Sequence, residues 1–466
     1  MVHQDSTGGV AVVMVPLPAQ GHLNQLLHLT RIISTSGLPV HFLGAATHNR
    51  QAKDRVHGWD PSTISNIQFH DCEFPEFPTP PPDPKSAYNF PAHLMPTFYA
   101  SVKYLRDPLG RLLRELGSTH RRVVVVHDGL MSFAAHEASL LSNAEAYCFD
   151  ACSAFAVLHY IWEALGKPAD EEGKLFPKDI PFRTSFGGCT SDDFPEFSAQ
   201  NLKWLDYRAG DIYNTCNAIE DRFITLLAPF QADKKVWAIG PFNPIAFDSE
   251  LSPKHECLEW LDKQPPNSVI YVSFGTMTSV SDDQIAELAF GLERSEQRFL
   301  WVLRDADLGD IYKGSDEVRK NQLPEGFEDR IKGIGLIVRD WAPQVQILAH
   351  SSIGGFMSHC GWNSSMESLS MGVPIAAWPM HSDQPRNALL ITEVLKVGLM
   401  VRKWADRDEL VLAETIEGSI RTLMASDEGC ILRKRAYELG VEVRRAVSED
   451  GTSTTQLESF LSHILR

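Results

Sequence analysis

The chain has 466 residues, of which 43% are apolar and 22% charged, and its formal net charge is −17. A chain of this length is typical of two or three domains with a substantial core. A strongly acidic field repels nucleic-acid phosphates, so we expect no nucleic-acid partner and only local capture of any anionic ligand.

The N-terminal segment lacks the features of an export signal. Its apolar run, Val10–Val15, is too short for a signal-peptide core and ends at Pro16. No stretch approaches the roughly 18 consecutive apolar residues of a membrane-spanning helix. The eight cysteines are scattered without a CxxC pair, which indicates reduced thiols. We therefore expect a cytoplasmic protein with no membrane span. A monomeric state is a separate expectation.

The first half alternates short apolar runs with helical periodicity, the pattern of parallel βαβ units. Apolar runs predict strands at 10–15, 40–43 and 123–126. Leucines at helical spacing predict a helix over 23–33, with Gly37 as its C-terminal cap.

The alternation of short apolar runs with helical periodicity resumes near residue 268. Five further apolar runs predict strands at 269–274, 299–303, 336–338, 353–358 and 374–378. Ser281 with Gln284 predicts a capping box at the start of a helix. The Pro- and Ser-containing stretch 243–254 separates the two halves, and 434–466 has the pattern of an amphipathic helix. The fold class is therefore α/β, with two doubly wound domains joined by a hinge.

Several cofactor motifs are absent from the sequence. The loop after the first strand has no G-x-G-x-x-G, and no acidic residue ends the second strand, which argues against a dinucleotide cofactor. Asp305 and Asp307 could hold a divalent cation on a diphosphate, but an exposed acidic loop is the commoner meaning of such a pair. We expect no metal.

The segment 358–367, SHCGWNSSME, predicts a strand that turns through glycine into a helix. Asn363 or Ser364 is a candidate N-cap, and Ser364 with Glu367 forms a capping-box pattern. A helix start of this kind points free N–H groups and a partial positive charge outward, which favours a phosphate. His359 adds a donor; the alternative is a well-capped helix without a ligand.

Residues 341–384, a run of 44, resemble the signature box of plant UDP-sugar-dependent glycosyltransferases. The segments 18–22, 236–241 and 257–276 extend the resemblance over most of the chain. It implies a GT-B fold of two facing Rossmann-like domains. The implied division is an acceptor-binding domain (1–245), a UDP-sugar-binding domain (246–440) and a C-terminal helix that crosses back (441–466).

The resemblance also implies roles for individual residues, with UDP-glucose as co-substrate and no metal or other cofactor. The aromatic face of Trp341 and the backbone of Ala342 would bind uracil. The remaining donor contacts would be Gln344 and Glu367 on the ribose, Thr276, His359, Asn363 and Ser364 on the diphosphate, and Trp362, Asp383 and Gln384 on the sugar. Glutamine at the last position favours glucose over galactose.

His22 and Asp128 are the candidate catalytic residues. His22 lies where the first predicted strand meets its helix, and Asp128 follows the predicted strand 123–126. Both lie at the carboxyl edge of the sheet, where open α/β folds bind ligands. Taken alone, His22 would more often be a surface residue, and Asp128-Gly129 a turn. The resemblance implies instead that His22 is the base and Asp128 its partner. A non-catalytic UDP-sugar sensor would not need to keep both.

The segments 20–29, 48–61 and 127–131 resemble the zeatin O-glucosyl- and O-xylosyltransferases. This implies transfer of glucose, or of xylose, to the side-chain hydroxyl of a zeatin-type cytokinin. Asp150 departs from the resemblance, because histidine is expected there in the zeatin enzymes and threonine in many relatives. A flavonoid or other phenolic acceptor therefore stays open, in a pocket formed by Phe74, Phe77, Phe90, Phe149 and Phe155.

Overall fold

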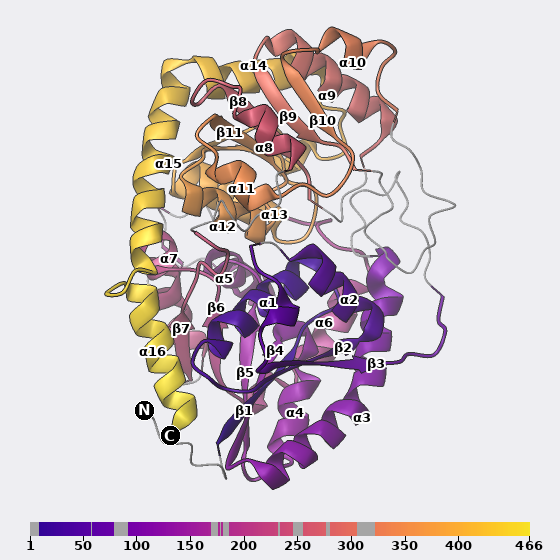
Figure 1. Cartoon of the computed structure of the whole chain (residues 1–466), viewed down its shortest axis with the longest axis vertical. Helices are drawn as coiled ribbons and strands as arrows, with labels where there is room; N and C mark the ends of the chain where they lie inside the picture. The colour runs from indigo at the N-terminus through magenta and orange to yellow at the C-terminus, as the bar shows by residue number, and fades with distance from the viewer. Residues whose placement is uncertain are drawn as a thin grey trace.

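The computed structural model describes residues 9–56, 58–78, 92–168, 176–177, 179, 186–231, 234–245, 255–275, 280–304 and 322–466. These residues form two lobes, each built around one parallel sheet (Figure 1). Within the described residues, no helix is long and apolar enough to cross a membrane. The predicted α/β class with two doubly wound domains is confirmed.

The first sheet has seven strands in the order β3-β2-β1-β4-β5-β6-β7. Its strands are β1 (Val10–Val15), β2 (Val40–Ala45), β3 (Ile67–Cys72), β4 (Arg122–Asp128), β5 (Ala144–Asp150), β6 (Arg208–Tyr213) and β7 (Lys235–Ala238). The helices of this lobe are α1 (Gln20–Ser34), α2 (Ala46–Arg55), α3 (Met95–Thr119), α4 (Phe133–Ser139), α5 (Ala154–Ala164), α6 (Phe194–Leu202) and α7 (Asn217–Leu227).

The second sheet has six strands in the order β10-β9-β8-β11-β12-β13. Its strands are β8 (Val269–Ser273), β9 (Arg298–Val302), β10 (Gly335–Val338), β11 (Ile353–Ser358), β12 (Ile375–Ala377) and β13 (Gly398–Met400). Its helices are α8 (Glu256–Leu261), α9 (Asp282–Ser295), α10 (Phe327–Arg330), α11 (Gln344–Ala349), α12 (Trp362–Met371), α13 (Gln384–Leu389) and α14 (Ala413–Ala425), before the C-terminal α15 (Asp427–Ala446) and α16 (Thr452–Leu465).

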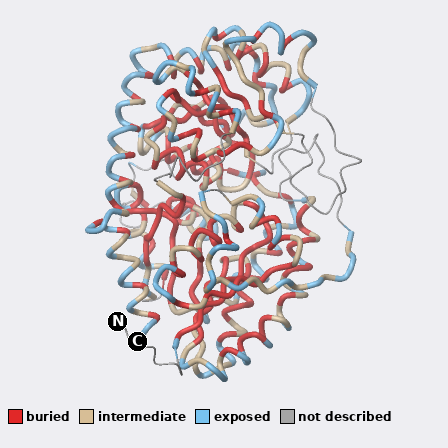
Figure 2. The backbone as a smooth tube through the Cα atoms, viewed as in Figure 1, coloured by how far each residue is buried: buried red, intermediate tan, exposed pale blue. Residues whose placement is uncertain are grey.

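Both faces of the central strands are buried, which explains their unbroken apolar runs (Figure 2). In β1, Val10, Val12 and Met14 pack in one core cluster with α1, and Ala11 and Val13 pack in another with α3 and α4. Since successive side chains of a strand point to opposite faces, neighbouring residues of β1 contribute to the core layers on the two sides of the sheet.

The C-terminal helices connect the lobes. The α15 helix packs on α12 and α14 of the second lobe and on α7 of the first, and α16 continues along the first lobe (Figure 1). Phe460 and Ile464 of α16 are fully buried in a core cluster of the first sheet. The chain end therefore belongs structurally to the lobe in which the chain begins.

Several local predictions need correction. The first helix ends at Ser34 and is capped by Thr35, while Gly37 takes a positive φ of 81° in the turn that follows. The predicted C-terminal helix is two helices separated near Gly451. Ser281 does cap α9, but the Gln284 side chain bonds the backbone of Val411 instead of closing the capping box.

Candidate active site

Two sheet edges face one cavity of about 880 Å³. In the first sheet, β1 and β4 are neighbours, and their following helices α1 and α4 pack on opposite faces. In the second sheet, β8 and β11 are neighbours at the corresponding position. Such switch points, where successive connections diverge, are where open α/β sheets bind ligands. His22, Asp128, His359 and Asn363 all line this cavity.

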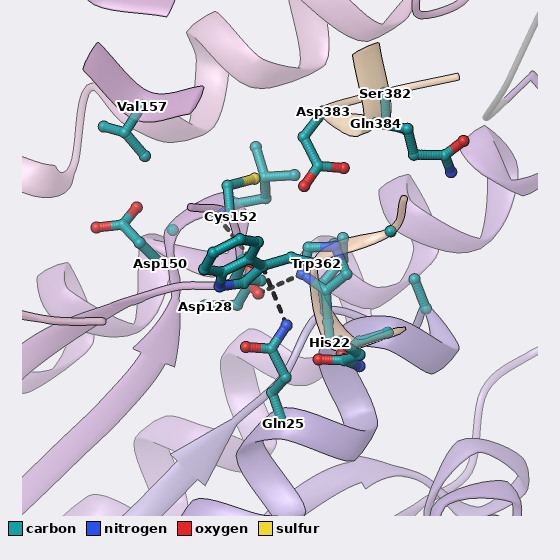
Figure 3. Close-up of a pocket in the computed structure, with 18 of the residues that line it drawn as sticks. His22, Gln25, Asp128, Asp150, Cys152, Val157, Trp362, Ser382, Asp383 and Gln384 are labelled. Atoms are coloured by element: carbon teal, nitrogen blue, oxygen red, sulfur yellow. Dashed lines mark hydrogen bonds and ion pairs between the residues drawn. The ribbon is translucent and has the colours of Figure 1, made fainter. Parts of the chain in front are cut away.

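His22 lies in the first turn of α1, and Asp128 is the last residue of β4 (Figure 3). The Nδ1 of His22 is 2.6 Å from Oδ2 of Asp128, with the imidazole 26% and the carboxylate 3% exposed. The other carboxylate oxygen accepts the N–H of Leu130 at 2.9 Å. Because a carboxylate only accepts, Nδ1 of His22 carries a proton and Nε2 is left unprotonated.

The charge of Asp128 also sets the protonation of His22. Burial lowers the pKa of His22, but the charge and hydrogen bond of Asp128, together with the charge of Asp383, outweigh it. The pKa of His22 is therefore raised above its ordinary value. An imidazole with a raised pKa and a fixed tautomer is suited to accept a proton.

The start of α12, which lines the same cavity as this pair, is not capped by a side chain. Gly361 is the N-cap of α12, and no side chain caps the helix. The predicted N-caps and the capping box are therefore wrong: the side chains of Ser364 and Glu367 accept hydrogen bonds from Gln344 at 2.8 and 2.6 Å. The first N–H groups of α12 thus keep their capacity to bind an anion.

His359 is held beside this helix start by two glycines. A Cβ on Gly275 would lie 2.7 Å from its Nε2, and a Cβ on Gly361 would lie 2.6 Å away. Burial lowers the pKa of His359 to about 4, so the ring is neutral. Its Nδ1 is buried without a hydrogen-bond partner among the described residues. A neutral, closely packed imidazole can donate to a phosphate without a large rearrangement.

Asn363 and Trp362 reach across to the first lobe. Asn363 donates its side-chain amide to the backbone oxygen of Gly21 at 2.8 Å, directly before His22. The indole N–H of Trp362 donates to the backbone oxygen of Asn214 at 2.9 Å. The helix that we expected to bind only the donor is therefore bonded to the helix that carries His22.

A second polar group lies along α11 and α12. Gln344 donates to Glu367 and accepts from the hydroxyl of Tyr271 at 3.1 Å. Burial raises the pKa of Glu367 to about 7, against the opposing effect of its bond with Gln344. Such buried amide and carboxyl groups are typical partners of ligand hydroxyls.

Trp341, at the edge of this group, stacks with two cations. The guanidinium carbons of Arg304 and Arg55 lie 4.9 and 5.4 Å from the centre of its ring. Arg55 ends α2 of the first lobe, whereas Arg304 follows β9 of the second. The Trp341 face is thus part of the junction between lobes, and Ala342 beside it also lines the cavity.

Asp383 and Gln384 begin α13 above the His22 pair (Figure 3). Asp383 accepts from Asn387 at 2.8 Å. The side-chain oxygen of Gln384 accepts the N–H groups of Met380 and His381 at 2.9 and 3.0 Å, so its own loop orients it. Thr276, Asp305 and Asp307 lie outside the described residues.

The structure changes the expected acceptor pocket. Of the five phenylalanines predicted there, only Phe149 is among the described lining residues, because Phe155 is buried in a core cluster and Phe74 packs against another. Phe90 lies outside the described residues. Sequence analysis missed the lining residues Phe98, Phe194, Phe230, Gln25, Tyr160, Asp211 and Gln231. They come from α1, α3, α5, α6, β6 and the chain after α7, and no shared motif connects them.

Comparison with known proteins covers nearly the whole chain. Residues 8–244 match the family described as glycosyltransferase, N-terminal domain, and residues 247–416 match UDP-glucoronosyl and UDP-glucosyl transferase. The chain is 50% identical to zeatin O-glucosyltransferase of Phaseolus lunatus, over 98% of this chain and 97% of that protein. It is also 50% identical to zeatin O-xylosyltransferase of Phaseolus vulgaris, over 98% of both.

Solved structures of similar proteins also match nearly the whole chain. UGT2 of Phytolacca americana complexed with UDP-2fluoro-glucose and pterostilbene is 28% identical, with a TM-score of 0.76 and coverage of 98% of this chain and 100% of that one. TcCGT1 in complex with UDP is 27% identical, with a TM-score of 0.78 and coverage of 98% and 99%.

Proposed function

The chain belongs to the UDP-glucoronosyl and UDP-glucosyl transferase family, and on this basis we propose that it transfers glucose from UDP-glucose to the side-chain hydroxyl of a zeatin-type cytokinin. The observation that carries the proposal is the His22–Asp128 pair in the same cavity as the open start of α12. That cavity offers a base for a hydroxyl and an anion site for a leaving diphosphate. The names of the zeatin-specific relatives support the acceptor class.

The reaction in this proposal is a single displacement. The acceptor hydroxyl gives its proton to Nε2 of His22 as its oxygen bonds the anomeric carbon. The bond from that carbon to the UDP oxygen breaks, and its electron pair leaves with UDP. Attack opposite the leaving group converts an α-linked donor into a β-glycoside. Asp128 fixes the tautomer of His22 and stabilises the imidazolium.

The second lobe supplies the donor site. Trp341 and the Ala342 backbone bind uracil, and Gln344 and Glu367 bind the ribose. The N–H groups of α12, with the side chains of His359, Asn363 and Ser364, stabilise the charge that develops on the diphosphate. In this proposal the sugar is held by Trp362, Asp383 and Gln384.

Some features stay predictions. Thr276 is proposed as a further diphosphate contact. Metal independence rests on the α12 dipole and a hydrogen bond from the neutral His359 ring to stabilise the diphosphate charge, and unchanged transfer in EDTA would support it.

The cytoplasmic location and the monomeric state are also predictions. Xylose is the alternative sugar, since the glucosyl- and xylosyltransferases of Phaseolus are equally identical to this chain.

The test is an acceptor screen with UDP-glucose and UDP-xylose against trans-zeatin, cis-zeatin, dihydrozeatin and flavonoids. We expect a hexose-mass product with at least one zeatin and little product with flavonoids. The phenolic alternative has less support, because flavonoid 3-O-glucosyltransferase 7 of Fragaria ananassa matches only 50% of this chain. Product from flavonoids alone would reject the zeatin acceptor while leaving the transferase chemistry in place.

Gly361→Ala should weaken UDP binding. Its new Cβ would fall 2.6 Å from Nε2 of His359, so the ring must move away from the start of α12. Loss of one charge-assisted hydrogen bond of this type predicts a rise in the Kd of UDP of roughly 10- to 100-fold, measurable by calorimetry. The matched control is Gly418→Ala, at an exposed site on α14 with open space around it. Equal UDP affinity in both variants would contradict the role of His359.

A further inference from the structure

A polar cluster lies in the part of the cavity that the first lobe forms. Asp150 ends β5, the strand beside β4, and pairs in register with Tyr213 of β6. A Cβ on Gly129, the residue after Asp128, would lie 3.7 Å from Oδ1 of Asp150. A ligand atom of Asp211 lies within 4.8 Å of one of Asp150, and Arg208 is paired with Asp211. Gln231 lines the same cavity. The cluster therefore borders the His22–Asp128 pair on the side of the acceptor.

Two oxygens of residues that line the cavity with Asp150 lack hydrogen-bond donors. Asp211 is 2% exposed; its Oδ1 accepts from Nε of Arg208 at 2.5 Å, while its Oδ2 has no partner. Gln231 is 5% exposed, and its Oε1 also has no partner among the described residues. An unpaired buried acceptor is costly, so a ligand that donates hydrogen bonds here would gain more than on a solvated surface.

The charges around Asp150 also favour a ligand that donates hydrogen bonds. Burial, the charge of Asp211 and, more weakly, that of Asp128 raise the pKa of Asp150 to about 7, against the hydrogen bond from Tyr213 and the charge of Arg208. Arg208 is bonded to Asp211 rather than to Asp150. Burial raises the pKa of Asp211, against the hydrogen bond and charge of Arg208 and the charge of Lys234. Lys234 itself bonds the backbone oxygens of Asp206 and Arg208. Two acceptor oxygens, Oδ2 of Asp211 and Oε1 of Gln231, are thus left without a donor among the described residues.

The surrounding wall is apolar. It is formed by Val157, Ile161, Phe194, Leu202, Leu227 and Phe230. In the view of Figure 3, Asp150 and His22 lie on opposite sides of the Trp362 side chain. An acceptor whose hydroxyl contacts His22 must extend along the first lobe, because the second lobe holds the donor. Such a molecule crosses apolar walls and then meets acceptor oxygens.

We propose that Asp150, supported by Asp211 and Gln231, accepts hydrogen bonds from the N–H groups of the acceptor's nitrogen heterocycle and selects aminopurines over phenols. This rests on the proposed function. An N6-substituted aminopurine carries an exocyclic N–H and a ring N–H that only donate, joined by an apolar chain to the reacting hydroxyl. A single phenolic hydroxyl offers one O–H donor to such a site, whereas the aminopurine offers two N–H donors.

A metal site is the main rival. The ligand atoms of Cys148, Asp150 and Asp211 lie within 4.8 Å of one another. However, the Arg208 guanidinium is bonded to Asp211, and a cation at that position repels a dication. The cluster therefore fits neutral N–H donors better than a metal ion.

The test uses N6-isopentenyladenine, the zeatin analogue without the side-chain hydroxyl, as a ligand that cannot be glycosylated. Calorimetry should show that Asp150→Leu weakens its binding by roughly 10- to 100-fold, and Asp150→Asn, which keeps one acceptor oxygen, by less. UDP affinity and the melting temperature of Asp150→Leu should match those of the wild type. Asp221→Leu, at an exposed site on α7, is the matched control and should bind like the wild type.

The outcomes are separable. If the wild type converts zeatin but Asp150→Leu binds N6-isopentenyladenine as tightly as the wild type, the inference is wrong. Binding that EDTA abolishes and Zn²⁺ restores would also overturn it in favour of the metal site. If the wild type transfers glucose to flavonoids and not to zeatin, the proposed acceptor fails first, whatever Asp150 does.

Discussion

Replacing His22 with alanine should lower kcat for glucosyl transfer by roughly 10²–10⁴-fold, the usual contribution of a positioned general base. An acceptor hydroxyl has a pKa far above neutrality, and no other described histidine in the cavity has a raised pKa: burial lowers those of His359 and His381. Initial rates at saturating UDP-glucose and acceptor would give kcat directly. The Kd of UDP should change little, because the donor residues lie on the second lobe.

His22→Gln distinguishes loss of the base from loss of the hydrogen bond to Asp128. Glutamine can donate a hydrogen bond to Asp128 but cannot accept a proton at neutral pH. We expect it to be as inactive as the alanine variant, with unaltered UDP binding. Transfer at the wild-type rate in either variant would exclude His22 as the base and leave the proposed mechanism without one.

The fold was predictable because its strands are buried on both faces. Apolar runs such as Val10–Val15 are strong local signals, and the observed strand matches the predicted one. The order of the strands is not local. The placement of β4 beside β1, which brings Asp128 to His22, is a pairing between distant segments that spacing alone does not reveal.

The site was predictable where it depends on a helix start and not where it depends on tertiary partners. The Ser364–Glu367 capping box failed because Gln344 of α11 competes for both side chains. Asn363 has a partner on the other lobe, the Gly21 carbonyl, that no local pattern contains. Asp150 stood out in the sequence, but its neighbours on β6 and after α7 became evident only in three dimensions.

Hydrogen bonds between the lobes connect the proposed donor and acceptor sites. Asn363 binds the backbone beside His22, Trp362 binds Asn214, and Asn387 of α13 accepts from Ser153 at 2.8 Å. Each bond joins a helix of the second lobe to a segment of the first lobe. In the proposed mechanism, α12 and α13 therefore help to fix the position of His22 relative to the sugar.

Asp128→Asn should be nearly as damaging as loss of His22 itself, with kcat lower by roughly 10²–10⁴-fold. Asparagine can donate its amide N–H to Nδ1 of His22, which is 2.6 Å from the present carboxylate oxygen. The proton would then move to Nε2, so the nitrogen that faces the cavity would donate instead of accept.

The pH profile distinguishes this effect from simple misfolding. Burial lowers the pKa of His22 and Asp128 raises it, with a net increase, so the wild-type acid limb of kcat/KM should lie above pH 6.5, the ordinary value for histidine. Because the base must be neutral, activity rises with pH through that pKa. In Asp128→Asn only burial and the more distant Asp383 remain, and the acid limb should move to lower pH while the plateau falls. A variant with a lower plateau and an unmoved acid limb would show that Asp128 does not control the protonation of His22.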